Sequence, residues 1–509
     1  SNIHDNAYAV GTLDLTGDQS ILLGPDGPSL GGFVCSVTTA KGEMWKLGQL
    51  HPGDKVHFRL LDLDQAKEIR EAEEANLRHE HQEVVLPEQK DLDYHYAILA
   101  EETAAGTKIV ARLDGEDNIL VEYGEMELDI AIRFRVHVLM QELKKKNLPI
   151  IDLTPGIRSL QVHFDIEKIS LKEMLAAVLE TNRTLPELSD VTVPSRIIWL
   201  PLSWDDPQTQ LAAKRYQQTV RPNAPWCPSN PEFIRRINGL DSIEDVKKIV
   251  FDADYLVLGL GDVYLGAPVA TPVDPRHRMV TTKYNPARPW TPENAVGIGG
   301  AYLCVYGMEG PGGYQFVGRT IQMWNPLKET EYFKHGKPWL LDFFDQIRFY
   351  PVSAEEILKD REDFLRGRFK IKIEETSFNL GKYEQFLKEH EDTIRVFKDH
   401  QEASFEAERK MWKEKGLDEF DSETQDAPAI VEETVPDGCE AARTNIPGSV
   451  WKVLVEDGQK VREGDTLVIL ESMKMEFPVT AEYSGIIEKV YLKPGEQVNS
   501  GQLAASIRV

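Results

Sequence analysis

The chain has 509 residues, of which 41% are apolar, so it is long enough for roughly three or four domains with their own cores. Its 84 acidic and 58 basic residues give a net charge of −26, which argues against nucleic acid as a partner. No apolar run is long enough to predict a membrane span, and residues 1–5 lack the features of a signal peptide. The four cysteines stand far apart without zinc spacing, so we expect a reduced, cytoplasmic protein that binds no metal.

Residues 1–62 predict short strands and no helix of any length. Gly and Pro separate the apolar runs between residues 11 and 33, a pattern typical of turns between strands. A turn at residues 49–54 precedes a further expected strand over residues 54–58. The charged, Ala-rich segment 63–91 favours an exposed helix with a solvated charged face that bridges two units.

Strands and helices alternate over residues 92–190, which predicts an α/β lobe of the βαβ kind. Helices are expected over residues 128–146 and 170–182, the second one opened by a capping box of Ser170 and Glu173. The expected strands cover residues 118–123, 150–153 and 159–165.

Residues 191–345 are again mostly β, and two further segments lead to the C-terminal domain. Expected strands cover residues 196–202, 255–261 and 296–306, with helices at 206–219 and 242–249. Residues 346–417 predict a helical segment, including a long helix over residues 382–416 that ends at Gly416. Residues 418–440 are acidic and contain Pro, which indicates an extended linker.

Residues 441–509 contain an internal duplication with an offset of 37 residues. Each half alternates apolar residues with Gly turns, so we expect short strands in a small flattened barrel with a pseudo-twofold axis. Lys474 lies at the join of the halves, where a hairpin end would hold it in solvent. The matched pairs are Gly448/Gly485, Lys452/Lys489, Val453/Val490, Gly458/Gly495, Val461/Val498 and Gly464/Gly501.

Four tracts of this sequence resemble biotin-dependent amide carboxyltransferases. Residues 471–476 (ESMKME) are similar to the attachment site of the biotin carboxyl carrier domain, which implies biotin bound covalently to Lys474 between Met473 and Met475. Residues 26–33 (DGPSLGGF) resemble the end of the KipA-like half of that family. Residues 155–165 and 311–320 resemble its KipI-like half, whose second lobe is a cyclophilin-like β-barrel.

The resemblance implies a multidomain α+β, mostly β fold with a defined order of units. These are the end of a KipA-like half (1–62), a bridging helix (63–91), a KipI-like α/β lobe (92–190), a cyclophilin-like barrel (191–345), a helical segment (346–417), a linker (418–440) and a biotin carboxyl carrier domain (441–509). The family's KipA-like half is longer than 62 residues, so we expect more sequence ahead of residue 1.

The same order of units resembles urea carboxylase, which transfers CO2 from carboxybiotin to urea and forms allophanate. The sequence has no P-loop, so a biotin carboxylase part that uses ATP and bicarbonate is expected upstream or in trans. Biotin protein ligase and an allophanate hydrolase are the further partners that the resemblance implies. Nucleic acid and membranes are not expected partners.

Three alternatives stay open. Guanidine is a possible acceptor in place of urea, and as a cation it should require a carboxylate in its pocket. Residues 258–266 depart from the pattern of simple KipI-like proteins, which favours a substrate different from theirs. The chain also resembles KipI–KipA regulatory binding proteins, here with a fused carrier domain. A carrier for acyl-CoA carboxylation is the third alternative, although no crotonase-type transferase is visible in the sequence.

Candidate site residues come from the Gly-rich tracts that the two halves are expected to bring together. A base must take a proton from the poorly nucleophilic amide nitrogen, and glycines permit close backbone approach and amide donation. A turn aspartate at Asp26 and a structural ion pair at Arg319 remain competing interpretations. The catalytic candidates are Asp26, Tyr306, Tyr314 and Arg319. The pocket candidates are His4, Asn6, Ser29, Gly31, Gly32, Gly312, Gly313 and Gln315, with Tyr8, Asp262 and Tyr264 as weaker ones.

Overall fold

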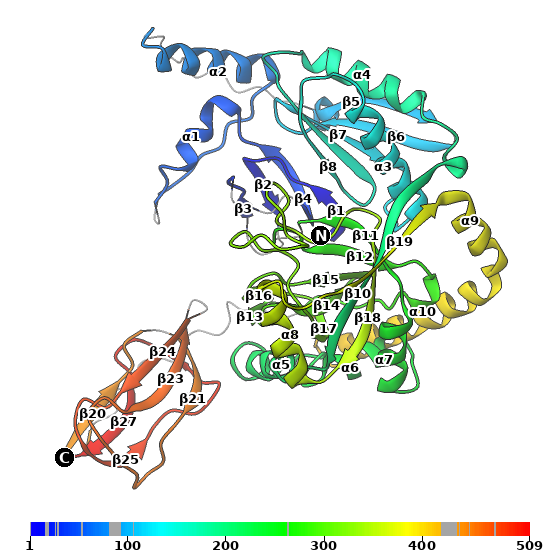
Figure 1. The fold of residues 1–509 in the computed structure, drawn as a ribbon. Helices are drawn as coiled ribbons and strands as arrows, with labels where there is room; N and C mark the ends of the chain where they lie inside the picture. Colours follow the sequence, from blue (N-terminus) through cyan, green and yellow to red (C-terminus); the bar gives the residue numbers. More distant parts are fainter. Residues whose placement is uncertain are drawn as a thin grey trace.

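The computed structural model describes the whole chain except residues 1, 16–19, 26, 28–29, 52–53, 81–92, 105, 262–263, 419–434, 437, 447 and 473–474. Four assemblies follow one another in the chain: a small N-terminal sheet, a five-stranded lobe, a β-barrel surrounded by helices, and a C-terminal carrier domain (Figure 1). The expected mixed, mostly β, multidomain fold class is confirmed by this topology.

The N-terminal sheet has the strand order β1-β4-β2-β3, and all neighbours are antiparallel. Its strands are β1 (Asn2–Ala7), β2 (Thr12–Leu15), β3 (Ser20–Leu22) and β4 (Leu30–Thr38). The expectation of no helix here is wrong, because a 3-10 turn (Lys41–Glu43) continues into α1 (Met44–Leu47). The strand expected at 54–58 is also wrong: residues 54–60 are exposed and have no regular structure, since no neighbouring strand pairs with them.

The expected bridging helix is α2 (Leu63–Leu77), which begins with a capping box of Asp62 and Gln65. Its charges are not all solvated as predicted. Arg70 is buried, and its guanidinium lies 2.5 Å from the carboxylate of Glu116 in the lobe. One face of α2 therefore attaches the helix to the unit that follows it.

The lobe is an antiparallel sheet with the order β5-β6-β7-β9-β8, so the βαβ expectation is wrong. After α3 the chain enters the edge strand β8, and a tight turn then returns it as β9 beside β7, antiparallel to both. The helix α4 begins with the expected Ser170–Glu173 capping box. The lobe comprises β5 (Ile98–Ala104), β6 (Thr107–Leu113), β7 (Asn118–Tyr123), α3 (Ile130–Lys144), β8 (Ile150–Pro155), β9 (Ser159–Phe164) and α4 (Leu171–Arg183).

The central sheet closes into a barrel because β17 pairs with β10 as well as with β14. Seven strands form the ring, and β19 (Lys372–Asn379) extends it beside β10. The strand expected over residues 296–306 is instead a hairpin, because Gly300 has a φ of +60° and reverses the chain. The ring strands are β10 (Thr192–Trp204), β11 (Tyr255–Leu260), β12 (Pro268–Pro272), β14 (Ala295–Gly299), β15 (Tyr302–Val305), β17 (Gln315–Arg319) and β18 (Gln346–Val352).

A small hairpin of β13 (Arg288–Thr291) and β16 (Gly310–Gly312) lies beside the barrel. The helical segment expected at 346–417 is wrong for β18 and β19, which belong to the barrel sheet. The expected long helix is two helices that meet at His390, and its end at Gly416, with a φ of +64°, is as predicted. The helices are α5 (Pro207–Thr219), α6 (Asn230–Ile237), α7 (Ile243–Asp252), α8 (Ala354–Leu365), α9 (Leu380–Glu389) and α10 (Glu391–Glu414).

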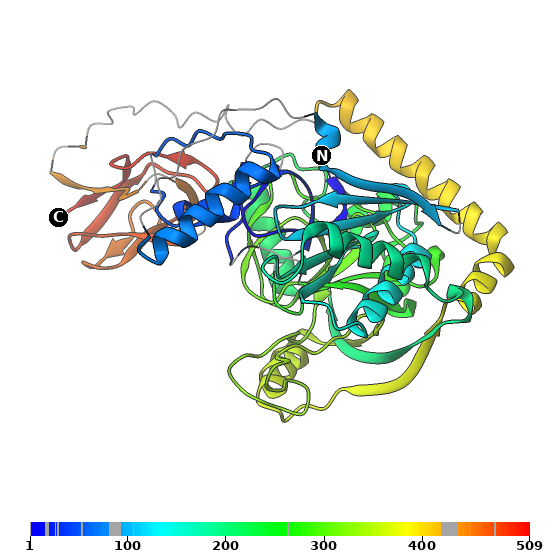
Figure 2. The same ribbon diagram turned by 90° about the horizontal axis from the view of Figure 1, so that it is seen from above.

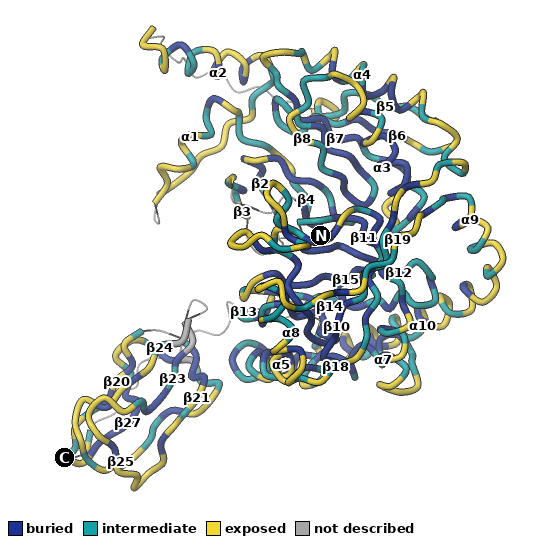
Figure 3. Tube along the Cα trace, viewed as in Figure 1, coloured by how far each residue is buried: buried dark blue, intermediate teal, exposed yellow. Residues whose placement is uncertain are grey.

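The helix α10 runs along the outside of the molecule (Figure 2). Its Trp412 stacks on Phe233 of α6 with ring centroids 5.9 Å apart, which fixes its C-terminal end to the barrel unit. Burial is concentrated in the barrel strands and the lobe sheet, whereas the outward faces of α2, α9 and α10 are exposed (Figure 3). Among the helices in the described part of the chain, none is long and apolar enough to cross a membrane.

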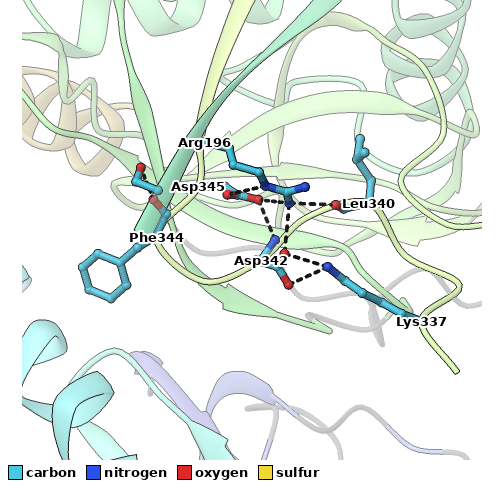
Figure 4. A network of polar contacts seen from close by, with 7 residues as sticks. Arg196, Lys337, Leu340, Asp342, Phe344 and Asp345 are labelled. Atoms are coloured by element: carbon cyan, nitrogen blue, oxygen red, sulfur yellow. Dashed lines mark hydrogen bonds and ion pairs between the residues drawn. The ribbon is translucent and has the colours of Figure 1, made fainter. Parts of the chain in front are cut away.

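The loop before β18 joins the barrel to the lobe. The Arg196 guanidinium on β10 donates to both carboxylate oxygens of Asp345 and, at 3.1 Å, to the carbonyl of Leu340 (Figure 4). These bonds hold Phe344 in a left-handed conformation with a φ of +69°. The fully buried Phe344 ring then lies 5.5 Å from the ring of Phe134 on α3. A charged network on the barrel thereby sets the position of the lobe.

The C-terminal domain has the duplicated structure that its sequence predicts. It has two four-stranded sheets, β20-β27-β25-β22 and β24-β23-β21-β26, and the offset of the duplication maps each strand order onto the other. The matched turn glycines agree in φ: +84° at Gly458 and +89° at Gly495. The strands are β20 (Cys439–Arg443), β21 (Gly448–Val453), β22 (Lys460–Val461), β23 (Thr466–Ser472), β24 (Met475–Thr480), β25 (Gly485–Val490), β26 (Gln497–Val498) and β27 (Leu503–Arg508).

The buried His137 of α3 makes the stability of the fold depend on pH. Burial, followed by the charge of Arg133, lowers the pKa of His137 to about 3. The unfolded chain takes up this proton near pH 6.5 and the folded chain does not, so stability is lost as the pH falls from about 6.5 towards 3, by up to about 1.4 kcal/mol per pH unit.

A His137→Leu variant is therefore expected to flatten this dependence in denaturant titrations made between pH 7 and pH 4. The exposed His51 provides the control, since His51→Gln leaves the slope unchanged. An unaltered slope in His137→Leu would show that other groups cause the acid sensitivity.

Candidate functional site

The outer face of β15 is the surface on which several of the candidate residues meet. Leu303 and Val305 point into the barrel core. Because side chains alternate along a strand, Tyr302, Cys304 and Tyr306 point outward. All three are nonetheless buried, so other elements cover this face.

His4 of the N-terminal sheet contacts one end of this face. Its Nδ1 lies 2.5 Å from the hydroxyl of Tyr302. Burial raises the pKa of Tyr302 well above its usual value, so the phenol stays protonated in this hydrogen bond. Burial, followed by the charge of Arg158, lowers the pKa of His4, and the ring also hydrogen-bonds the backbone of Met126. The neutral imidazole thus ties β1 to β15.

Asn6 and Asp5 connect the same strand to the lobe. The Ser159 hydroxyl donates to Oδ1 of Asn6 at 2.5 Å, and the amide of Ile157 donates to the carbonyl of Asp5 at 2.8 Å. The Asp5 side chain is buried, and its charge reaches Tyr302. Sequence reasoning missed Asp5, because the register shift between Asn2 and Asn6 that places it has no local signature.

The glycines of β4 allow β1 to lie close against them. A Cβ at Gly31 would lie 2.4 Å from the hydroxyl of Tyr8, and one at Gly32 would lie 2.8 Å from the carbonyl of Ile3. The same hydroxyl accepts a hydrogen bond from the amide of Phe33 at 2.8 Å, and burial raises the pKa of Tyr8. The close approach expected at these glycines is thus to β1, and amide donation to a ligand stays a prediction.

Two predicted catalytic tyrosines lie together on the barrel. The rings of Tyr306 and Tyr314 are 6.4 Å apart, and the hydroxyl of Tyr306 accepts from the amide of Tyr314 at 3.2 Å. Tyr264 adds a third ring, 6.3 Å from that of Tyr306. Gly312 permits this arrangement, since a Cβ there would lie 2.8 Å from the Tyr306 ring. Trp290 packs against the same cluster, which we call the tyrosine cluster.

Lys283 links the tyrosine cluster to the N-terminal sheet. Its Nζ lies 5.3 Å from the ring centroid of Tyr314 and 5.5 Å from that of Phe33 on β4. The side chain is half-buried, and no carboxylate pairs with it among the residues that the structure describes. Gly313 lies beside it, where an added Cβ would be 3.4 Å from Lys283 Cβ. Sequence reasoning missed Lys283, which belongs to no motif.

Arg319 and Gln315 lie apart from the tyrosine cluster. The Arg319 guanidinium donates to the carbonyl of Glu293 at 2.8 Å, and burial lowers its pKa. The Gln315 amide donates to the carbonyl of Thr282 at 3.0 Å, on the strand face opposite to Tyr314 and Phe316. Catalytic and pocket roles for these two residues remain predictions.

Several candidates lie outside the described residues, namely Asp26, Ser29, Asp262, Met473 and Lys474. Their neighbours in the carrier domain are informative, however. Ser472 at the end of β23 pairs with Met475 at the start of β24, so the strands before and after Lys474 are antiparallel neighbours. Attachment of a tethered cofactor to Lys474 stays a prediction from the sequence.

Two cavities lie away from these residues. One, of about 450 Å³, lies between α5 and the start of α6 and is lined by Asp205, Lys214 and Asn230 among others. The other, of about 390 Å³, is lined by Asp254, Asp274 and Tyr383 among others. Neither cavity is lined by a residue that the sequence predicted for the site. The described candidates that contact one another lie instead where the N-terminal sheet meets the outer barrel face, and this junction is the candidate site.

Comparison with known families identifies the units. The carboxyltransferase domain, subdomains A and B, matches residues 1–60, and its subdomains C and D match residues 109–333. The biotin-requiring enzyme family matches residues 434–507. The fold and these matches define a biotin-dependent carboxyltransferase unit joined to a biotin carrier domain.

Relatives over the whole chain narrow this class. A urea amidolyase of Lachancea kluyveri is 37% identical over 100% of this chain, which spans 28% of its length. A putative urea carboxylase of Emericella nidulans is 30% identical over 100% of this chain, which spans 43% of its length. The crystal structure of Kluyveromyces lactis urea carboxylase covers 100% of this chain and 45% of its own, with 37% identity and a TM-score of 0.81. The chain belongs to the urea carboxylase family and contains its carboxyltransferase and biotin carrier domains.

Proposed function

We propose that this chain transfers a carboxyl group from biotin attached to Lys474 to urea, giving allophanate. The observation that carries the proposal is the similarity over its entire length to urea amidolyases and urea carboxylases, carrier domain included. The chain spans less than half of these relatives. A biotin carboxylase part that uses ATP and bicarbonate, a biotin protein ligase and an allophanate hydrolase are therefore partners that we propose. We also propose the domain boundaries given above, with β18 and β19 assigned to the barrel.

The junction of Phe33, Lys283 and the tyrosine cluster is where we place the transfer. Biotin supplies the carboxyl group when it is bound. The Lys283 ammonium attracts the negative charge of that group throughout the transfer, and the half-buried setting strengthens the attraction relative to water. The urea nitrogen gains the carboxyl group and loses a proton, which must pass to the nitrogen that gave up the carboxyl group. Tyr306 and Tyr314 are the hydroxyl groups at hand to guide that proton.

Charge at the junction favours urea over guanidine as the acceptor. Guanidine is a cation at neutral pH, and Lys283 repels it, whereas urea is neutral. The buried Asp5 is the observation that supports guanidine, because a carboxylate would pair with a guanidinium. A regulatory binding protein of the KipI–KipA kind is the remaining candidate, and it predicts no transfer to either compound.

The experiment that tests the proposal supplies the chain with free ¹⁴C-carboxybiotin and either urea or guanidine. The proposal predicts labelled allophanate with urea and much slower labelling with guanidine. Labelling of guanidine alone would replace urea with guanidine as the substrate. If neither urea nor guanidine is labelled, and carboxybiotin disappears at the same rate with and without them, the regulatory binding protein would be favoured.

A further inference from the structure

Trp451 of the carrier domain is buried on the side that faces away from the carrier core. Val450 and Val453 pack in that core, whereas Trp451 is not part of it and lies at the register shift between Val450 and Lys452, so its side chain points outward. Only 4% of Trp451 is nonetheless exposed. A large aromatic side chain on an outward face is buried in this way only when a second unit covers it.

The covering unit is α5 of the barrel. The Arg215 guanidinium lies 4.8 Å from the ring centroid of Trp451 and 5.9 Å from that of Trp290 on β13. The turn at Gly495 also approaches α5, where a Cβ would lie 2.4 Å from the carbonyl of Gln218. Arg215 is thus placed between one tryptophan of the carrier and one of the barrel, a favourable arrangement for cation–π attraction.

The internal duplication shows that the carrier fold does not itself require this tryptophan. The offset of 37 residues places Trp451 on Glu488 in the other half. Glu488 is a half-exposed carboxylate that pairs with Arg508 within the carrier. The same position of the same strand pattern thus holds a charge that pairs within the carrier in one half and a buried indole that contacts Arg215 of the barrel in the other.

We propose that Trp451 is a positioning residue that docks the carrier on Arg215 and Trp290 for carboxyl transfer. β21 lies in the same sheet as β23 and β24, so fixing Trp451 fixes the two strands that flank Lys474 in the sequence. Trp290 belongs to the tyrosine cluster, so the docking contact adjoins the proposed site of transfer. A single aromatic anchor suits a carrier that must also leave, because it is strong enough to orient and weak enough to release.

The docking itself can be measured without biotin. The sample is the full chain with Lys474→Ala, labelled with 5-fluorotryptophan and observed by ¹⁹F NMR. The resonance that disappears in Trp451→Phe is assigned to Trp451. We expect Arg215→Ala to move this ¹⁹F resonance and to enlarge its shift between H2O and D2O, because the indole becomes exposed. The neighbouring Lys214→Ala is the control and leaves it in place. An unchanged resonance in Arg215→Ala would overturn the docking contact.

The role in transfer rests on the proposed function, so the second experiment separates the two. Carboxyl transfer to urea is compared between carboxybiotin carried on Lys474 and free carboxybiotin supplied to the Lys474→Ala chain. We expect Trp451→Ala to slow carrier-borne transfer by about tenfold or more, the effect of removing an interface anchor. Transfer from free carboxybiotin should stay within about twofold, and Trp451→Phe should retain most carrier-borne transfer.

Each of the other possible outcomes of the transfer experiment contradicts one specific claim. Equal losses with free and carrier-borne carboxybiotin would show that Trp451 acts on the site and not on docking. An unchanged carrier-borne rate would overturn the positioning role. If the chain that carries Lys474→Ala alone cannot transfer the carboxyl group from free carboxybiotin to urea, the proposed function is overturned instead. Glu488→Ala, at the matching position of the other half, is the control that should change neither rate.

Discussion

The Lys474→Ala variant is expected to lose all carboxyl transfer from the carrier to urea. The lysine is the attachment point that the ESMKME tract predicts, and Ser472 and Met475, which flank it in the sequence, pair with each other. Without an amine at this position no biotin is bound, and without biotin the carrier has nothing to deliver. Intact mass should show biotin on the unaltered chain and none on the variant, and urea-dependent transfer should fall to background.

A second carrier lysine separates a specific loss from damage to the domain. Lys460 is exposed on the same domain, and Lys460→Ala should keep both the biotin and the transfer. The described carrier core is built from apolar residues such as Val450 and Leu470, so the thermal unfolding of the domain should be unaltered. Biotin found on the Lys474→Ala chain would place the attachment at another residue.

Lys283→Ala is expected to slow carboxyl transfer by about 10²-fold or more, the usual effect of removing one group that stabilises developing or transferred negative charge. The Lys283 ammonium lies between Phe33 and Tyr314, at the junction of the N-terminal sheet and the barrel. The loss should appear with free carboxybiotin as well as with the attached form, because Lys283 acts on the carboxyl group and not on the carrier. The rate of labelled allophanate formation measures it.

Charge is the property that this prediction tests. Lys283→Arg keeps the charge and should recover part of the rate, whereas Lys283→Met keeps most of the length and should not. Lys370, exposed and distant from the junction, is the control, and Lys370→Ala should leave the rate unchanged. Equal rates for Lys283→Met and the unaltered chain would exclude Lys283 from the transfer site.

Local signals explain the parts of the fold that the sequence determined by itself. The carrier domain is one such part, because its turns need glycines with positive φ at Gly458 and Gly495 and its two halves repeat the same strand pattern. The start of α4 is another, because Ser170 and Glu173 cap it within four residues of each other. Attachment at Lys474 is likewise inferred from a continuous tract. In each case the residues that interact are close in the sequence, so the pattern alone contains the information.

Only the tertiary structure decided which distant residues meet. The antiparallel lobe depends on β8 occupying a sheet edge. The barrel depends on β18 joining β10, and β19 extends the sheet on the other side of β10, a strand that precedes both by more than a hundred residues. Lys283 and Asp5 become site candidates because of neighbours on other units, and Trp451 becomes an anchor only once α5 covers it. The physical reason is that burial and charge depend on what surrounds a side chain in space, which no local sequence period records.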